Sequence, residues 1–308
     1  MSENKYIVIY YNDKDQTSKG GYGDKIVGLV SSLMISKLIN YKFKICWERD
    51  NFDNYFDIKH STISSDNFKQ NDFKRYDHID FKNYFMKNEN NLFPYKYNII
   101  TIGKEISHFL VKNDSLTIDN YYKNILNYYQ NLYKNILIPK KILIDEVNKL
   151  CINKNNPIVG IQIRMGDSYI KNIKGYDSLF SSKRIIKTKN KLKELLKYIK
   201  TNIKFKQYSV FITSDFYDNF TISKEIFDDV IYYNSKITHS GQSKNINFIK
   251  TIVDNLILAN KCDQLFISQH SNFGRIAALA NKSDDIYDIF CKKLNKKKLI
   301  SKYNISFK

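Results

Sequence analysis

The chain has 308 residues, of which 43% are hydrophobic, and its formal net charge is +19. This length suits one large domain or two ordinary ones, and the hydrophobic content excludes an intrinsically disordered polymer. No run reaches the ~18 apolar residues of a membrane helix, and the first apolar run ends at Asn12 and Asp13, too early for a signal peptide. We therefore expect a cytoplasmic protein.

The positive charge does not by itself predict a nucleic-acid partner. Its excess is lysine, interleaved with Asn, Ile and Tyr through the whole chain as an A/T-rich genome would produce, without a basic stripe or a nucleic-acid motif. A phosphate-bearing donor, an anionic glycan or a peripheral contact with an anionic membrane surface accounts for the charge. Four cysteines without paired spacing predict neither a zinc site nor a disulfide framework: Cys46, Cys151, Cys262 and Cys291.

The first fifty residues predict a strand, a glycine loop, a helix and a second strand. The strands are expected at 6–11 and 43–47, and the helix from Asp24 to about Asn40, where apolar residues recur three or four positions apart. This order is half of a nucleotide-binding α/β unit. Residues 50–145 have weak periodicity and predict only short helices and loops, followed by a crossover helix between Pro139 and the polar run at 153–157.

From Pro157 onward, predicted strands and helices alternate. We expect strands at 158–163, 208–213, 230–233 and 264–268, and helices at 191–203, 247–261 and 271–281. Such alternation predicts a parallel sheet covered on both faces. The sequence thus predicts an α/β fold of the GT-B type, with two Rossmann-like domains facing across a cleft. We assign 1–148 to an acceptor-side domain and 149–308 to a nucleotide-sugar-binding domain, whose last helix can pack back on the first.

Three polar clusters follow predicted strands of the second half: RMGD at 164–167, SD at 214–215 and SQHSN at 268–272. Open parallel sheets bind ligands at the carboxyl ends of their strands. The last cluster also opens a helix, whose N–H groups favour anions. Arg164 is one of five arginines among 50 basic residues, which favours a need for its planar, bidentate group. The clusters predict a nucleotide with its phosphates, whereas Arg275, inside the last helix, is expected to brace the packing.

These residues resemble the fucosyltransferase superfamily that includes the alpha-1,6, alpha-1,2, nodulation and protein O-fucosyltransferases. GIQIRMGD at 160–167 is similar to its His-x-Arg-x-Gly-Asp motif, and GYGDK at 21–25 resembles its N-terminal Gly-x-Gly-Asn-Arg/Gln loop. FITSD at 211–215 and the segment 254–277 resemble its second and third C-terminal motifs. The resemblance covers 20–47 and about 157–280 in the right order, and 50–145 match nothing that we can name.

The resemblance implies an inverting, metal-independent transfer of fucose or a related sugar from a GDP-sugar to a glycan or glycolipid, without a cofactor. Arg164 would bind the β-phosphate and stabilise the departing GDP. Asp24 would be either the catalytic base or only a helix cap. The other donor-binding residues that we carry over are Gly21, Gly23, Gln162, Asp215, Asp254, Ser271, Asn272 and Phe273. Gln162 stands where the motif has His and Asp24 where it has Asn, which leaves the base or ribose contact and the donor sugar open.

Other functions stay open at this point. Gly21-x-Gly23 with Glu48 on the next strand partly fits a dinucleotide fingerprint of an NAD(P)-dependent oxidoreductase, but Ile26 takes the place of the third glycine. Asp13 and Asp15 form an Asp-x-Asp pair for a metal-dependent glycosyltransferase, although a charged loop explains the pair better. His239 is a solvated loop residue or a contact to acceptor or nucleotide. A binding module without turnover is a further alternative.

Overall fold

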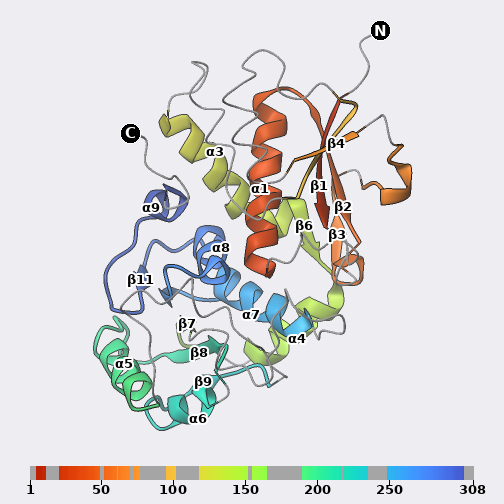
Figure 1. The fold of residues 1–308 in the computed structure, drawn as a ribbon. Helices are drawn as coiled ribbons and strands as arrows, with labels where there is room; N and C mark the ends of the chain where they lie inside the picture. The colour runs from red at the N-terminus through yellow and green to blue at the C-terminus, as the bar shows by residue number, and fades with distance from the viewer. Residues whose placement is uncertain are drawn as a thin grey trace. The chain divides into compact units, whose positions relative to one another are not determined.

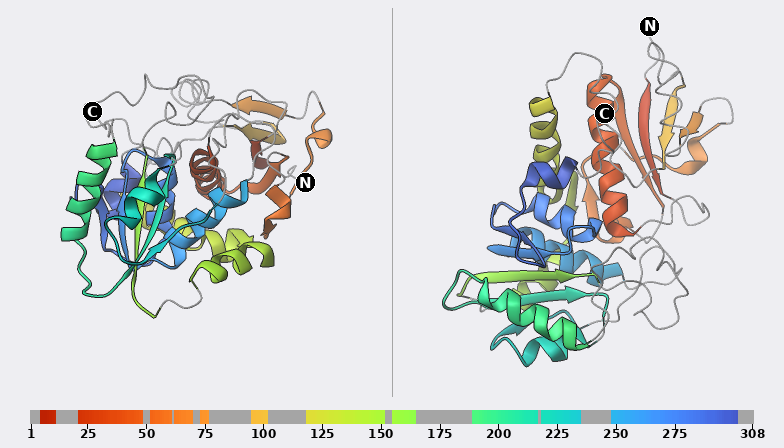
Figure 2. Two further views of the ribbon diagram at one scale, coloured as in Figure 1. Left: turned by 90° about the horizontal axis from the view of Figure 1, so that it is seen from below. Right: turned by 60° about the vertical axis from the view of Figure 1, so that its left-hand side comes forward.

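The computed structural model describes residues 5–11, 21–48, 52–60, 62–69, 73–76, 95–101, 118–151, 155–164, 189–216, 218–234 and 248–301. The chain packs as two compact units, Met1–Lys140 with Ile300–Lys308, and Lys141–Leu299. Each unit contains a parallel sheet with helices (Figures 1 and 2), which confirms the α/β class. The domain boundary that we predicted between 148 and 149 lies inside helix α4 (Lys141–Cys151).

The first unit is built on a four-stranded parallel sheet in the order β2-β1-β5-β4. Its strands are β1 (Tyr6–Tyr11), β2 (Lys42–Trp47), β4 (Phe73–Tyr76) and β5 (Tyr97–Ile100). Helix α1 (Tyr22–Leu38) joins β1 to β2 and packs against both the sheet and helix α3 (Ile118–Gln130) (Figure 1). The predicted apolar face of α1 is buried, as expected for a helix between two layers.

The prediction for residues 50–145 is partly wrong, because this region also supplies strands. β4 and β5 complete the parallel sheet, and β3 (Phe56–Ile58) pairs antiparallel with β6 (Leu137–Pro139). The short helices expected in this region include two 3₁₀ segments, Phe52–Asn54 and Ser65–Asn67, and one π-helical segment, Leu132–Ile136. Strands this short carry too few residues to show a period of two, and pairing partners far away in sequence decide whether they form. Asn98 in β5 illustrates this, since its buried amide donates to the carbonyls of Tyr6 and Tyr95.

The second unit is built on a five-stranded parallel sheet in the order β11-β10-β7-β8-β9. The strands are β7 (Ile158–Ile163), β8 (Ser209–Ser214), β9 (Val230–Ile231), β10 (Gln264–Ile267) and β11 (Ile286–Asp288). The helices are α4, α5 (Lys189–Thr201), α6 (Asn219–Lys224), α7 (Phe248–Asn260), α8 (Asn272–Ala280) and the first four residues of α9 (Lys296–Ser301), whose last two residues belong to the first unit. All predicted elements of this half are confirmed, with small shifts at their ends, whereas α6, α9 and β11 were not predicted.

The strand order reverses between β7 and β10. The chain runs from β7 through β8 to β9 on one side, and then returns to place β10 on the other side of β7. Val159, Ile161 and Ile163 of β7 belong to a core cluster with α5. Gly160 lies on the opposite face, where a Cβ would come within 2.8 Å of Leu258 in α7. The sheet is thus covered on both faces, and its carboxyl edge has the reversal point at which such sheets bind ligands.

Several sequence expectations can be checked at the level of packing. Arg275 in α8 is buried, and its guanidinium donates to the backbone carbonyl of Leu299, so that it braces the packing of α8. The four cysteines are free thiols. Among the described residues, no helix has the length and apolar character needed to cross a membrane.

Candidate functional site

Two of the three predicted clusters meet through Arg164, which follows β7. Its guanidinium Nη1 lies 3.0 Å from Oδ2 of Asp215, which follows the neighbouring strand β8. The Asp215 side chain is 7% exposed and that of Arg164 is 30% exposed, so the carboxylate anchors a guanidinium that solvent can still reach. A carboxylate partner fixes the planar fork of an arginine, which suits it to meet an incoming phosphate.

The third cluster joins the same edge through Ser268, which follows β10. The backbone N–H of Arg164 donates to Ser268 Oγ at 2.9 Å. Ser271 then precedes α8 as its N-cap residue, in extended conformation and without a side-chain capping bond. The first N–H groups of a helix have no partner within the helix and carry the positive end of its dipole. The loop after β10 therefore brings an anion-attracting helix end to the β7–β10 reversal point.

Gln162, the penultimate residue of β7, contacts the loop that leads into α8. It is 3% exposed, its Oε1 accepts the N–H of Ser268 at 3.1 Å, and its Nε2 donates to Ser271 Oγ at 3.4 Å. A Cβ at position 274 would lie only 2.3 Å from Gln162 Oε1, so the close approach of α8 to this amide requires Gly274.

Asp254 and Phe273, which we expected among the donor-binding residues, are placed by helix packing. Asp254 is 2% exposed, and its Oδ2 accepts from Thr213 Oγ1 at 2.7 Å and from Lys250 Nζ at 2.8 Å. Burial raises the pKa of the Asp254 carboxyl, against the opposing effect of Lys250. The backbone carbonyl of Phe273 accepts from Asn255 Nδ2 at 2.9 Å. These bonds connect α7 to β8 and to the first turn of α8.

Gly21, Gly23 and Asp24 lie in the first unit, at the start of α1. The helix begins at Tyr22, earlier than predicted, so Gly23 lies within its first turn and Gly21 is the N-cap residue. The Asp24 carboxylate accepts the N–H of Gly21 at 3.0 Å, which is the capping arrangement. Asp24 also adds to the effect of burial in raising the pKa of Tyr11, whose hydroxyl donates to the carbonyl of Lys25.

Some of the predicted residues lie outside the described ranges: Asp13, Asp15, His239 and the segment 165–167. Across the part of the chain that is described, no three His, Cys, Asp or Glu side chains gather as metal ligands would. A metal-free site remains a prediction.

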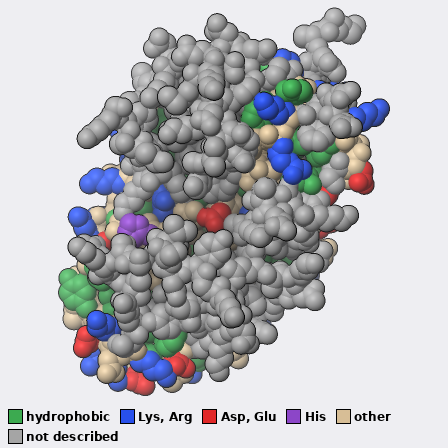
Figure 3. Space-filling view, in the orientation of Figure 1, with side chains coloured by type: hydrophobic (Ala, Val, Ile, Leu, Met, Phe, Trp, Pro, Cys, Tyr) green, Lys and Arg blue, Asp and Glu red, His purple; other side chains and the backbone are tan. Residues whose placement is uncertain are grey.

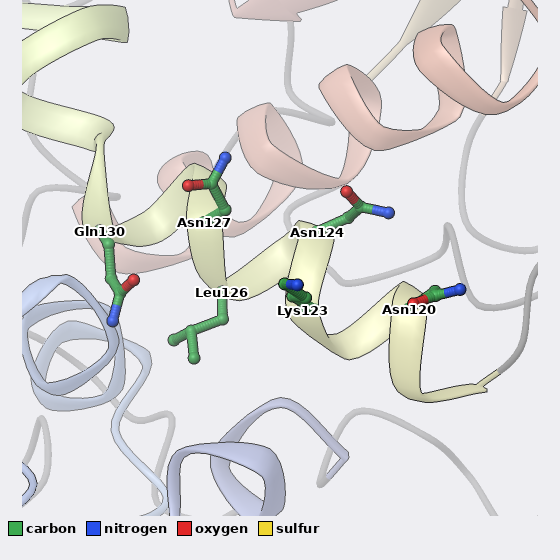
Figure 4. Close-up of a pocket in the computed structure, with 6 residues that line it drawn as sticks. All are labelled: Asn120, Lys123, Asn124, Leu126, Asn127 and Gln130. Carbon is green, nitrogen blue, oxygen red and sulfur yellow. The ribbon is translucent and has the colours of Figure 1, made fainter.

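A hollow lies along α3 in the first unit, and Figure 4 shows the side chains that line it, most of which are amides. Lys37 of α1 donates to one of these amides, Asn124, at 3.3 Å. None of the predicted site residues lines this hollow. The lining residues are Asn120, Lys123, Asn124, Leu126, Asn127 and Gln130.

The lysine excess is partly balanced where the structure describes it. Around α5 and α6, at the bottom of Figure 3, Lys and Arg side chains alternate with Asp and Glu side chains. Two ion pairs there join Lys193 to Glu225 at 2.6 Å and Lys189 to Asp218 at 2.5 Å. This described part of the second unit is therefore a mixed-charge surface, and the absence of a nucleic-acid partner stays a prediction.

Sequence reasoning missed Lys250 as part of this site, and it included Ser268 and Gly274 only as members of the segments 268–272 and 254–277. Lys250 carried a usable signal, because it lies four residues before Asp254 in the predicted helix, where such side chains are neighbours. The role of Gly274 was not predictable, since a single glycine in a helical pattern acquires meaning only from what it faces.

No protein-family model matches this sequence, and neither does any curated protein. Solved structures match its fold. Fucosyltransferase NodZ from Bradyrhizobium aligns over 91% of this chain and 94% of its own, at 13% identity and a TM-score of 0.57. A variant of Arabidopsis thaliana FUT1 in complex with GDP aligns over 93% and 71%, at 12% identity and 0.62. POFUT1 in complex with GDP-fucose aligns over 94% and 99%, at 11% identity and 0.54. The chain has the fold of these fucosyltransferases.

The fucosyltransferase fold confirms the predicted α/β, GT-B type architecture. It also confirms, at the level of the fold, the resemblance inferred from the four motifs. The alignments extend through most of the chain, including the region 50–145 in which no motif was found. The acceptor-side and donor-side roles of the two halves stay predictions.

Proposed function

We propose that this chain is a glycosyltransferase that moves fucose or a related sugar from a GDP-sugar to a glycan hydroxyl, with inversion and without a metal ion. One observation carries the proposal. In a chain with the fucosyltransferase fold, Arg164 is held by Asp215 at the reversal point of a parallel sheet, where the loop leading to the N-terminus of α8 also lies.

In the proposed reaction, the acceptor oxygen attacks the anomeric carbon as the bond between that carbon and the phosphate oxygen breaks. Negative charge then accumulates on the departing diphosphate. Arg164 would bind the β-phosphate and stabilise that charge, while Ser271 and Asn272 at the start of α8 would hold the phosphates. Donors fixed in place before the reaction can replace a metal ion in this role, because they need no reorganisation as the charge develops.

The remaining predicted residues complete the proposal. Asp215, Asp254 and Phe273 would lie near the nucleoside, and Gly21 and Gly23 would let the N-terminal loop approach the donor. Asp24 would take the proton of the acceptor hydroxyl. The related proteins were solved with GDP or GDP-fucose, which supports the choice of a guanine nucleotide for this chain.

Thermal stabilisation by a panel of GDP, UDP and NAD tests this function. GDP at about a hundred times its Kd should stabilise the protein by about 2.7 kcal/mol, and more than UDP or NAD does. In the same preparation, Arg164→Lys should reduce turnover on the order of a hundredfold to a thousandfold, because an ammonium cannot reproduce the bidentate fork.

Arg75→Lys is the matched control, since Arg75 is an exposed arginine of β4 in the first unit. It should leave GDP binding and turnover near normal. A larger stabilisation by UDP would point to another donor class, and a larger one by NAD would point to the oxidoreductase. Loss of turnover in EDTA, with recovery in Mn²⁺, would require a metal in place of Arg164.

A further inference from the structure

The side chain of Gln162 has both of its polar atoms engaged inside the protein. Its Oε1 accepts the N–H of Ser268, which is also held by the backbone carbonyl of Gln162 at 3.0 Å. Its Nε2 donates to Ser271 Oγ, three residues further along the same loop. One amide thus bonds to both ends of the turn that leads from β10 into α8.

The amide of Gln162 is buried against α8. Gln162 is 3% exposed, and an added Cβ on Gly274 would lie 2.3 Å from its Oε1 and 3.1 Å from its Cδ. The amide therefore occupies the space next to Gly274, between strand β7 and the first turn of α8. In this position its two polar atoms are directed to Ser268 and Ser271.

The same bonds connect the helix end to Arg164. Ser268 uses its N–H toward Gln162 and its hydroxyl toward the N–H of Arg164, at 3.1 and 2.9 Å. Ser271, Gln162, Ser268 and Arg164 thereby form one chain of contacts across the reversal point. In that chain Gln162 provides the side-chain link between Ser268 and Ser271, beside the backbone bond from the Ser271 N–H to the Ser268 carbonyl at 2.8 Å.

We propose that Gln162 is a positioning residue that holds the 268–271 turn and the N-terminus of α8 against β7, and that it does not contact the nucleoside. This proposal replaces our interpretation of Gln162 as a donor-binding residue. The part of the proposal that concerns ligand binding rests on the proposed function. Because the turn faces the diphosphate, loss of Gln162 weakens binding of the diphosphate part and leaves the choice of base unchanged.

Gln162→Met tests the proposal, since methionine has a similar length but forms neither hydrogen bond. Gln264→Met is the matched control. Gln264 is also a buried glutamine bonded through both polar atoms, to Lys204 and Asn202, but it lies at the opposite end of β10. Hydrogen exchange of the ligand-free protein measures directly how well the amides of this turn are protected. Titration calorimetry with GDP, UDP and inorganic pyrophosphate measures how the substitution changes the affinity for each ligand.

In Gln162→Met, amides 268–273 should exchange faster, whereas in Gln264→Met they should keep their protection. The affinities for GDP and for pyrophosphate should fall by the same factor, on the order of tenfold, with an unchanged preference for GDP over UDP. If Gln162→Met does not fold, Ser271→Ala leaves Gln162 in place and removes only the acceptor of its Nε2. Exchange should then rise mainly at 271–273.

Unchanged exchange at 268–273 would overturn the proposal. A loss of GDP affinity with unchanged pyrophosphate affinity and a reduced preference for GDP would also overturn it, because that pattern indicates a direct nucleoside contact. If the wild-type protein bound neither GDP nor pyrophosphate, the proposed function would fall, and the exchange measurement would still decide the role of Gln162.

Discussion

At the scale of single residues, Asp24 combines a contact seen in the structure with a proposed chemical role. Its carboxylate accepts the N–H of Gly21 across the first turn of α1. An asparagine in its place can accept the same N–H but cannot take a proton. Asp24→Asn should therefore keep the melting temperature and GDP affinity while transfer falls by about 10²–10⁴-fold, the usual contribution of a general base.

Asp119→Asn is the control for this variant, because Asp119 is also an acidic residue in the first turn of a helix, α3. It should change neither stability nor transfer appreciably. Near-normal transfer by Asp24→Asn would leave Asp24 as a cap alone, and the base would then be another residue.

Asp254 shows which features of a single residue could be predicted from the sequence. Its place in a motif-like segment was visible in the sequence, and its position on α7 is as expected. Its partner Lys250 was predictable, because it lies four residues earlier on the same predicted helix; the two groups are 2.8 Å apart and both side chains are buried. The bond from Thr213 of β8 was not predictable, because only the fold brings that hydroxyl within 2.7 Å of the carboxylate. Removing Lys250 alone would leave the Asp254 carboxylate buried without its cation, which is destabilising whatever Asp254 does for a ligand.

At the scale of elements, the contact between α8 and β7 depends on the missing side chain at Gly274. A methyl group there would lie 2.3 Å from Gln162 Oε1 and 3.2 Å from Ile267 Cβ. Gly274→Ala should destabilise the protein by about 1–3 kcal/mol, the usual cost of overpacking, and should weaken GDP binding because the helix end is displaced. Urea unfolding and calorimetry measure the two effects.

The double variant Gly274→Ala with Gln162→Ala tests whether overlap with the Gln162 side chain causes the loss of stability in Gly274→Ala. Truncating Gln162 removes the atoms that the new methyl group meets, so the two stability losses should sum to more than the loss in the double variant. Strictly additive losses would mean that the methyl group added at position 274 is accommodated without contact with residue 162. GDP affinity should stay low in the double variant.

Elements of the two halves differed in how well the sequence predicted them. Strands β7 and β8 are long apolar runs, because strands of a parallel sheet with helices on both faces are buried on both sides. β4 and β5 have four residues each, and β4 contains Lys74 and Arg75, so nothing in their composition separates them from a loop. Pairing with β1 and with each other makes them strands.

At the scale of the whole molecule, a single tryptophan in the first unit allows the unfolding of that unit to be compared with the unfolding of the whole chain. Trp47, the single tryptophan, is 8% exposed in β2 and stacks on Phe52 in the first unit. Circular dichroism follows the helices of both units. If the second unit binds the donor, GDP should raise the melting temperature recorded by circular dichroism more than the one recorded by Trp47 fluorescence.

Arg164→Ala is the control here, and both shifts should disappear in it. Equal shifts of the two signals in the wild-type protein would contradict the prediction. They would show that the two units unfold as one cooperative block.

The reversal of strand order has a consequence for synthesis of the chain on the ribosome. Gln162 and Ser268 are bonded neighbours although they lie 106 positions apart in sequence. At a typical 5–20 residues per second, β10 emerges roughly 5–20 s after β7. During that interval β7 can pair with β8, but the edge that β10 will cover stays open, and an apolar strand with an open edge invites pairing with other chains. The bonds that join Arg164 and Gln162 to Ser268 do not yet exist at that stage, so this edge is exposed to other chains until the last strands arrive.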